Sequence, residues 1–162
     1  MSHIYRPCAS AIVFNSKGLV LLGNRIDTKD DAWQFSQGGI EQGESPAIAA
    51  KRELFEEMSV KSVELIYVGT KPFRYEFPDE IKLAFRQRGI FASGQDIYFS
   101  LFYFTGNDDE INVQTEEPEF IQFKWDTLDF AVNNVVEFKK QAYSHAAAMI
   151  SPLIYQHLCH LT

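Results

Sequence analysis

The segment Gly38–Val60 constrains this 162-residue chain most strongly, because it combines clear helix signals with concentrated negative charge. Ser45 is a favourable N-cap, and Pro46 suits the first position of a helix. The residues that follow, up to Met58, are mostly Ala, Glu, Leu, Lys and Arg, which favour helix. We therefore expect a helix over residues 47–58 with its start at Ser45 and Pro46.

Three carboxylates fall on one face of this helix. Glu53, Glu56 and Glu57 are three and four positions apart, and an α-helix has about 3.6 residues per turn. Like charges at this spacing repel at a cost of roughly 0.2–0.5 kcal/mol per pair. Such a face is either simply solvated or binds hard cations such as Mg²⁺, which prefer carboxylate oxygens. The residues expected on the opposite face, toward the core, are Ala47, Leu54, Phe55 and Met58.

The spacing of the acidic residues fits a longer pattern. The residues that match G-x5-E-x7-R-E-U-x-E-E, in which U is apolar, are Gly38, Glu44, Arg52, Glu53, Leu54, Glu56 and Glu57. A match at so many positions rarely arises by chance, and the segment resembles the Nudix box, the loop-helix-loop signature of Nudix hydrolases. One position departs from it, since Ser59 stands where the box has Gly. Gly is favoured just after a helix because it tolerates positive φ, so the departure affects stability and removes no carboxylate.

The resemblance extends to one branch of this family, which contains bacterial RNA pyrophosphohydrolases and asymmetric dinucleoside-polyphosphate hydrolases. It covers residues from about 5 to 143. The flanking motifs that carry it are Tyr5-Arg6-Pro7, Trp33-Gln34-Phe35, Gln37-Gly38-Gly39-Ile40, Tyr75 before Pro78, Pro118-Glu119-Phe120 and Val135 to Lys139. The segment Gly94–Phe99 departs from the branch, because it is one residue shorter and lacks a Gln and a Lys. This difference concerns a contact to the nucleotide or to phosphate.

The resemblance implies a metal site with two or more Mg²⁺ or Mn²⁺ ions. The residues that would hold the ions are the Gly38 carbonyl, Glu53, Glu56 and Glu57. Glu44 and Arg52 would pair and fix the orientation of these carboxylates, as metal sites usually require. Glu119 matches a remote glutamate that approaches the metals in this branch, although an ordinary acidic loop is the competing interpretation. For the general base Glu53 is the first choice, with Glu56 and Glu119 as alternatives.

The same resemblance implies residues that bind the substrate. Arg6, Arg25 and Lys139 would hold the phosphate chain, and Tyr75 would contact the phosphates. Val136 and Phe138 are candidates for stacking on a base, because apolar and aromatic groups grip bases without requiring one sequence. Each cation could instead be a solvated surface residue, and Phe138 could belong to the helical core. The basic residues Lys82, Arg86 and Arg88 are expected in a loop, either as an electrostatic guide for RNA or as solvated charge.

The rest of the chain predicts a single domain over residues 1–162. Two apolar runs, 11–14 and 19–22, flank a turn and indicate a hairpin in a sheet covered on both faces. Strand composition recurs at 63–68, 71–77, 97–104 and 119–125, and Gln37-Gly38-Gly39 reads as a loop. Residues 132–158 favour helix, with Pro152 expected to interrupt it. We therefore expect an α/β (α+β) fold, a mixed β-sheet between helices, which the resemblance identifies as the Nudix fold.

Charge and cysteine content limit the partners. The formal net charge of -7 gives no general attraction for nucleic acid, so a polyanionic substrate needs local cations or metal. We therefore expect no DNA coating and no membrane insertion. Cys8 and Cys159 form no disulfide framework, and no signal peptide is recognisable, so we expect a cytoplasmic protein, as a monomer.

The expected function is hydrolysis of the 5′-terminal triphosphate of RNA to a 5′-monophosphate with release of pyrophosphate. The alternative within the enzyme class is hydrolysis of a dinucleoside polyphosphate, diadenosine tetraphosphate, to ATP and AMP. An alternative from another class is a nucleotide-sensing module with a Nudix fold and no catalysis. Such a module should lack a carboxylate of the box, whereas all of them are present here.

Overall fold

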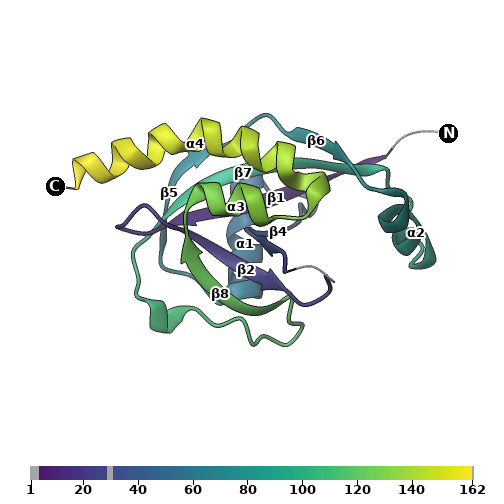
Figure 1. The fold of residues 1–162 in the computed structure, drawn as a ribbon, viewed down its shortest axis with the longest axis horizontal. Coiled ribbons are helices and arrows are strands. Elements are labelled where there is room, and N and C mark those ends of the chain that lie inside the picture. Colours follow the sequence, from purple (N-terminus) through teal and green to yellow (C-terminus); the bar gives the residue numbers. More distant parts are fainter. Residues whose placement is uncertain (1–3, 29–30, 162) are drawn as a thin grey trace.

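The computed structural model describes residues 4–28 and 31–161. Its centre is an eight-stranded mixed sheet with helices on both faces, which confirms the expected architecture (Figure 1). The main strand order is β3-β2-β1-β7-β5, while β4 pairs with β1, β6 with β7 and β8 with β2. The strands are β1 (Tyr5–Phe14), β2 (Val20–Arg25), β3 (Trp33–Gln34), β4 (Ser36–Gly39), β5 (Val63–Val68), β6 (Phe73–Glu76), β7 (Gly94–Phe104) and β8 (Phe120–Asp126).

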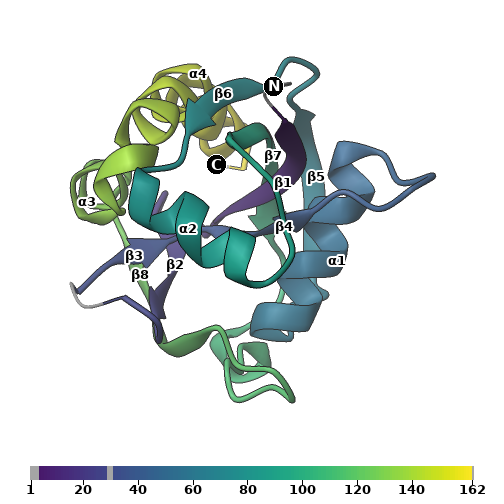
Figure 2. The same cartoon turned by 90° about the vertical axis from the view of Figure 1, so that its right-hand side faces the viewer.

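The helices lie in two layers around this sheet. They are α1 (Pro46–Met58), α2 (Asp79–Gln87), α3 (Leu128–Asn134) and α4 (Lys140–His160), with the short 3-10 turns η1 (Asp108–Glu110) and η2 (Glu137–Lys139). In Figure 1, α3 and α4 cross in front of the sheet and α1 lies behind it. Figure 2 shows α2 facing the viewer, between α3 and α4 on one side and α1 on the other. No helix in the described ranges is both long and apolar enough to cross a membrane.

The central strands are apolar on both sides because they contribute to two cores. β1 and β7 pair in parallel from Tyr5 and Gly94 to Phe14 and Tyr103. Along β1, Ile12 and Phe14 enter the core below α4, whereas the alternate residues enter the core below α1. The predicted hairpin is confirmed, since β2 pairs antiparallel with β1 after a tight turn.

The expected loop at Gln37–Gly39 is a strand, which corrects the prediction. β4 pairs antiparallel with β1, and Gly38 lies opposite Ala9. Two glycines in a row weaken the local preference for a strand, but the pairing partner lies about 30 residues earlier in the chain. The sheet therefore extends to the strand that faces Glu53 and Glu57 in the C-terminal half of α1.

The basic segment around Lys82, expected as a loop, is helix α2. Its first turn carries Asp79 and Glu80, which suit the positive end of a helix, and its last turn carries Arg86. Gly89, with a φ of 78°, follows the helix end. The predicted loop was therefore wrong for Lys82 and Arg86, which lie in α2, whereas Arg88 follows the last helical residue.

The prediction that Pro152 interrupts the C-terminal helix was also wrong. α4 continues from Lys140 to His160 with Pro152 inside it. Proline cannot donate to the carbonyl of Ala148, one turn earlier. Packing of Ile150 and Ile154 into the core on either side of the proline keeps the helix continuous. The helical region is also divided, because α3 and η2 precede α4.

Candidate active site

Local sequence fixes both ends of α1. The Ser45 hydroxyl accepts a hydrogen bond from the Ile48 amide at 3.3 Å, and Pro46 occupies the first turn, as predicted. The helix ends at Ser59, which has φ 62° and ψ 21°, a left-handed conformation that a glycine adopts without strain. The Ser59 hydroxyl donates to the Asn112 carbonyl at 2.9 Å. The replacement of the box glycine thus adds a hydrogen bond to the loop that leads toward Glu119.

The three glutamates of α1 differ in burial. Glu57 is 6% exposed, whereas Glu53 is half-buried and Glu56 exposed. The Glu57 carboxylate accepts from the Ser36 hydroxyl and the Gln37 amide, both at 2.9 Å. Burial raises the pKa of Glu57 to about 8, against these hydrogen bonds. Because burial disfavours the ionised form, the Glu57 carboxylate is readily ionised only when a cation lies beside it.

The packing face of α1 was partly mispredicted. Leu54 and Met58 are fully buried as expected, but Phe55 is 45% exposed and Ala47 is only half-buried. Glu57 takes up the space near the sheet that an apolar residue would otherwise fill. Phe55 instead lies under the Lys61 ammonium, 4.7 Å from its ring centre.

Arg52 links the remaining carboxylates. Its guanidinium binds both oxygens of Glu44, at 2.8 and 2.9 Å. It also donates to Glu53 at 2.8 Å and to Glu56 at 3.3 Å. These bonds raise the pKa of Arg52, chiefly through Glu44, and lower the pKa of Glu44. The structure thus brings together the pair Glu44 and Arg52 that the sequence singled out.

Gly38 leaves space for the Glu53 carboxylate. A Cβ atom at Gly38 would lie 2.0 Å from the carboxyl carbon of Glu53 and 2.2 Å from one of its oxygens. Only a residue without a side chain permits this approach. Burial raises the pKa of Glu53, while its bond to Arg52 lowers it.

The donor chemistry of this site suits a hard divalent cation. Carboxylates and a backbone carbonyl are the oxygen ligands that Mg²⁺ takes. The Glu53 carboxylate lies directly against the backbone of Gly38, a contact called here the Gly38 cradle. Across residues 4–28 and 31–161, however, no three acidic, histidine or cysteine side chains already stand in metal-binding geometry. Arg52 lies between Glu53 and Glu56 instead. Holding a metal therefore requires these side chains to turn away from Arg52.

Cations face the acidic helix across an open cleft of about 1050 Å³. The titratable residues around it are Arg6, Arg25, Glu53, Glu56, Glu57, Arg88, Glu116, Glu117 and Glu119. Glu119 is exposed in the loop before β8, as expected, and its negative charge helps to raise the pKa of Glu53. Arg6 is exposed at the start of β1. Opposite charges therefore gather on the walls of one cleft, although the whole chain is acidic.

Arg25 and Lys139 both donate a hydrogen bond to the side-chain amide of Gln34. The Gln34 side-chain oxygen accepts from Arg25 at 3.0 Å and from Lys139 at 3.3 Å. Arg25 is also paired with Asp27, whereas Lys139 has no ion pair in the described part of the chain. Burial and the nearby Arg25 lower the pKa of Lys139 to about 8. A buried cation without a counter-ion is a strong local attraction for an anion.

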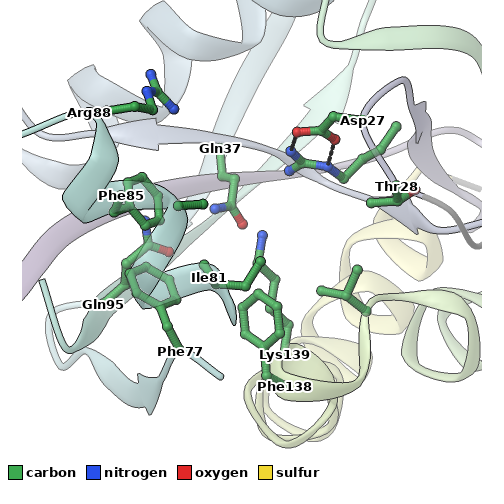
Figure 3. Close-up of a pocket in the computed structure, with 13 residues that line it drawn as sticks. Asp27, Thr28, Gln37, Phe77, Ile81, Phe85, Arg88, Gln95, Phe138 and Lys139 are labelled. Atoms are coloured by element: carbon green, nitrogen blue, oxygen red, sulfur yellow. Dashed lines mark hydrogen bonds and ion pairs between the residues drawn. The ribbon is translucent and has the colours of Figure 1, made fainter. Parts of the chain in front are cut away.

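An aromatic pocket of about 280 Å³ adjoins the cleft (Figure 3). The apolar residues that line it are Phe77, Ile81, Ala84, Phe85, Val136 and Phe138. Lys139 and Gln37 point toward each other in the middle of the pocket, and the Gln37 side-chain oxygen is buried with no partner among the described residues. The structure thus places Val136, Phe138 and Lys139 together, as the sequence suggested.

Tyr75 does not line either cavity. It is 6% exposed, packs against Phe77 and Phe138, and its hydroxyl donates to the Gln95 side chain. Its predicted contact to phosphates is therefore not supported by its position. Phe138 likewise packs on these rings, so it belongs to the pocket wall and to the core at once.

Sequence reasoning missed some residues of these walls. Gln34 and Gln37 stood in a quoted motif but received no role, and Phe85 received none because its segment was taken for a loop. The apolar residues Ile81 and Phe85, four positions apart, were the available signal for a helix with one face toward the protein.

This fold, with an acidic helix facing cations across one cleft, defines the class of the protein. The family model described as "NUDIX domain" matches residues 4–146, and the chain belongs to this family. The resemblance to Nudix hydrolases is thereby confirmed. Hydrolases of this family generally use divalent metal ions.

Relatives and solved structures agree with the assignment. A protein of Rickettsia africae (strain ESF-5) named RNA pyrophosphohydrolase is 36% identical over 150 residues, which cover 93% of this chain and 92% of the relative. Its namesake from Cereibacter sphaeroides (strain ATCC 17029 / ATH 2.4.9) is also 36% identical over 150 residues, 91% of each chain. The dihydroneopterin triphosphate pyrophosphohydrolase of E. coli shares the fold, with a TM-score of 0.63, 19% identity and coverage of 88% of this chain and 96% of that one. An Ap4A hydrolase of C. elegans has a TM-score of 0.61 and 14% identity, over 90% and 98% of the two chains.

Proposed function

We propose that this chain hydrolyses the 5′-terminal triphosphate of RNA, releasing pyrophosphate and leaving a 5′-monophosphate. The observation that carries the proposal is the joining of two cavities. A cleft lined by both carboxylates and cations adjoins a pocket of aromatic rings. The names of the relatives that match over more than nine-tenths of this chain support the same substrate.

The cationic wall would hold the phosphate chain. Lys139 is buried with no counter-ion among the residues that the structure describes, and Arg25 shares the Gln34 oxygen with it. A phosphate oxygen at this position would accept hydrogen bonds from both cations. Such charge-assisted hydrogen bonds are stronger than those between neutral groups. Arg6, on the exposed rim of the cleft, would bind the same chain from outside.

The acidic wall would hold the metal ions. Glu53, Glu56 and Glu57 are the proposed ligands with the Gly38 carbonyl, and Glu119 joins them from its loop. Two or more Mg²⁺ or Mn²⁺ ions, when held there, would supply positive charge against the phosphates and would lower the pKa of a bound water. Glu53, held against the backbone by the Gly38 cradle, is the proposed base that takes the proton from this water. Glu44 would keep Arg52 in place through its two hydrogen bonds after Glu53 and Glu56 have turned from Arg52 to the metals.

The aromatic pocket would receive the first base of the RNA. Val136 and Phe138 line it beside Lys139, so a base between these groups leaves its phosphates next to the cations. Stacking on aromatic side chains contributes roughly 1–3 kcal/mol per base and tolerates any base. We therefore propose broad acceptance of 5′ nucleotides.

Substrate competition tests the proposal. Purified protein with Mg²⁺ is offered 5′-triphosphorylated RNA and diadenosine tetraphosphate in separate reactions, and the products are resolved by chromatography. We expect faster turnover of the RNA, with pyrophosphate and 5′-monophosphate RNA as products. Faster turnover of the dinucleotide would make the chain a dinucleoside polyphosphate hydrolase, and no turnover of either would favour a binding module. A cytoplasmic monomer stays a prediction, and size-exclusion chromatography tests the oligomeric state.

A further inference from the structure

Arg88 stands at a fixed position at the end of α2. The Gly89 amide donates to the Arg86 carbonyl and the Ile90 amide to the Phe85 carbonyl, both at 2.9 Å. This pair of bonds, with Gly89 at a φ of 78°, is the Schellman pattern that ends a helix. Arg88 itself has φ -95° and ψ 9°. The hydrogen bonds of the helix end therefore fix the backbone conformation of Arg88.

Arg88 follows the last residue of α2 and is exposed, on the side of the helix end that lines the aromatic pocket. Ile81, Ala84, Phe85 and Arg88 recur at helical spacing, and all of them line the aromatic pocket. Arg88 also lines the cleft that holds the glutamates of α1. Figure 3 shows Arg88 beyond Phe85, on the side of the pocket away from Lys139. Arg86, two positions earlier, lines neither cavity.

No carboxylate pairs with Arg88 in the part of the chain that the structure describes. The acidic residues on neighbouring strands are engaged elsewhere, since Asp96 binds Arg74 at 2.8 Å and Glu76 accepts from the Tyr5 hydroxyl. The guanidinium carbon of Arg88 lies 5.9 Å from the centre of the Phe85 ring. A guanidinium over an aromatic ring at this distance keeps its planar donors free for an anion.

From this geometry we infer that Arg88 binds the phosphate chain of the substrate from the α2 side of the cleft, opposite Arg25 and Lys139. The inference rests on the proposed function, because it assumes that the cleft takes a polyphosphate. Arg88 would then determine specificity, because it joins the cleft to the pocket and favours substrates whose phosphates adjoin a base. A competing explanation is purely structural, since a cation near a helix C-terminus stabilises the helix.

Binding of inorganic tripolyphosphate separates these explanations. Wild-type protein and the variants Arg88→Gln, Arg88→Lys and Arg86→Gln are titrated calorimetrically with tripolyphosphate in the presence of Ca²⁺, which takes oxygen ligands without requiring turnover. We expect Arg88→Gln to weaken Kd about tenfold, the usual scale for one charged hydrogen bond, and Arg88→Lys to weaken it less. Arg86→Gln, the matched control on the same helix, should bind like the wild type. Melting temperatures of all variants report on folding.

The outcomes distinguish phosphate binding by Arg88 from a purely structural role. If Arg88→Gln binds tripolyphosphate as tightly as Arg86→Gln does, the inference is wrong and the proposed function stands. A lowered melting temperature for Arg88→Gln with an unchanged Kd likewise leaves only the structural role. If the wild type itself does not bind tripolyphosphate, the inference and the proposed function both fail. A salt titration adds a further readout, because loss of one phosphate contact reduces the slope of log Kd against log salt.

Discussion

The Glu53 carboxylate lies against the backbone of Gly38 so closely that a Cβ atom at residue 38 would sit 2.0 Å from its carboxyl carbon. The glycine of β4 and the glutamate of α1 therefore form one unit. The spacing of the box reflects this contact, because strand and helix must bring these two residues together. Glu57 is anchored to the same strand through Ser36 and Gln37. β4 is thus the support on which the acidic face of α1 is arranged.

The first prediction concerns Gly38. The substitution Gly38→Ala should displace the Glu53 carboxylate and lower kcat by about 100-fold, because a shift of about 1 Å in a catalytic group has this effect. Gly39→Ala is the matched control, since a Cβ there meets nothing within 4 Å. Turnover of 5′-triphosphorylated RNA and circular dichroism of both variants check the prediction. Equal losses in the two variants would show that the cradle does not position Glu53.

Arg52 supports a second prediction. When Glu53 and Glu56 turn to the metal, Arg52 stays bound to both oxygens of Glu44. Lysine cannot bind both oxygens of Glu44 and would compete with the metal for Glu53 and Glu56, so Arg52→Lys should weaken Mn²⁺ binding by roughly 10–100-fold. Glu44→Gln, which alters the same pair from the other side, should weaken it in the same direction. Titration with Mn²⁺, followed by electron paramagnetic resonance, measures the affinity. An unchanged affinity in both variants would assign the Arg52 network to structure alone.

Ser59 allows backbone strain to be separated from a hydrogen bond. Ser59→Ala keeps the left-handed φ of 62° and loses the bond to Asn112, so it should lower the free energy of unfolding by about 0.5–1.5 kcal/mol. Ser59→Gly loses the same bond but relieves the strain, so it should be more stable than Ser59→Ala by about 1 kcal/mol. Urea unfolding of the three proteins measures both differences. A less stable glycine variant would contradict the strain at this helix end.

Lys139 predicts a dependence of stability on pH. Its pKa falls from the ordinary 10.5 to about 8 on burial, so the unfolded chain binds more protons between these values. Stability therefore increases as the pH rises through this window, because the cost of burying the charge disappears. Lys139→Met removes that cost and should raise the free energy of unfolding by about 2–3 kcal/mol near pH 7.5.

The prediction for Lys139 is checked by measuring how the difference in free energy of unfolding between wild type and Lys139→Met changes with pH. Urea unfolding of wild type and Lys139→Met at about pH 7.5 and about pH 9.5 should show the difference narrowing by about 1–2 kcal/mol, since other titrating groups cancel between the two proteins. If this difference in free energy of unfolding were the same at both pH values, the pKa of Lys139 would not be lowered, and the side chain would have a counter-ion in solution.

The elements that local sequence determines were predicted well. The start of α1 follows from Ser45 and Pro46, and the hairpin after β1 follows from two apolar runs around a turn. The pairing of Glu44 with Arg52 followed from the family pattern, because the two residues are eight positions apart across a loop and a helix. In each case the decisive interaction is local or tied to a fixed spacing.

Other features depend on partners distant in the chain. β4 exists because Gly38 pairs with Ala9, although its glycines suggest a loop. Glu57 is buried and Phe55 exposed because Ser36 and Gln37 satisfy the carboxylate, and hydrophobicity along the helix contains no sign of this. The position of α2 over the pocket likewise depends on tertiary contacts, so Arg88, which lines the pocket, could not be distinguished from Arg86, which does not.

The central claim is that the acidic face of α1 holds divalent cations against a phosphate chain. The most direct measurement is anomalous diffraction from crystals soaked in Mn²⁺. The account predicts ions bound between Glu53, Glu56 and Glu57, with Glu53 and Glu56 turned away from Arg52. Crystals that show no manganese beside these carboxylates, with Arg52 still bonded to Glu53 and Glu56 at saturating Mn²⁺, would contradict it.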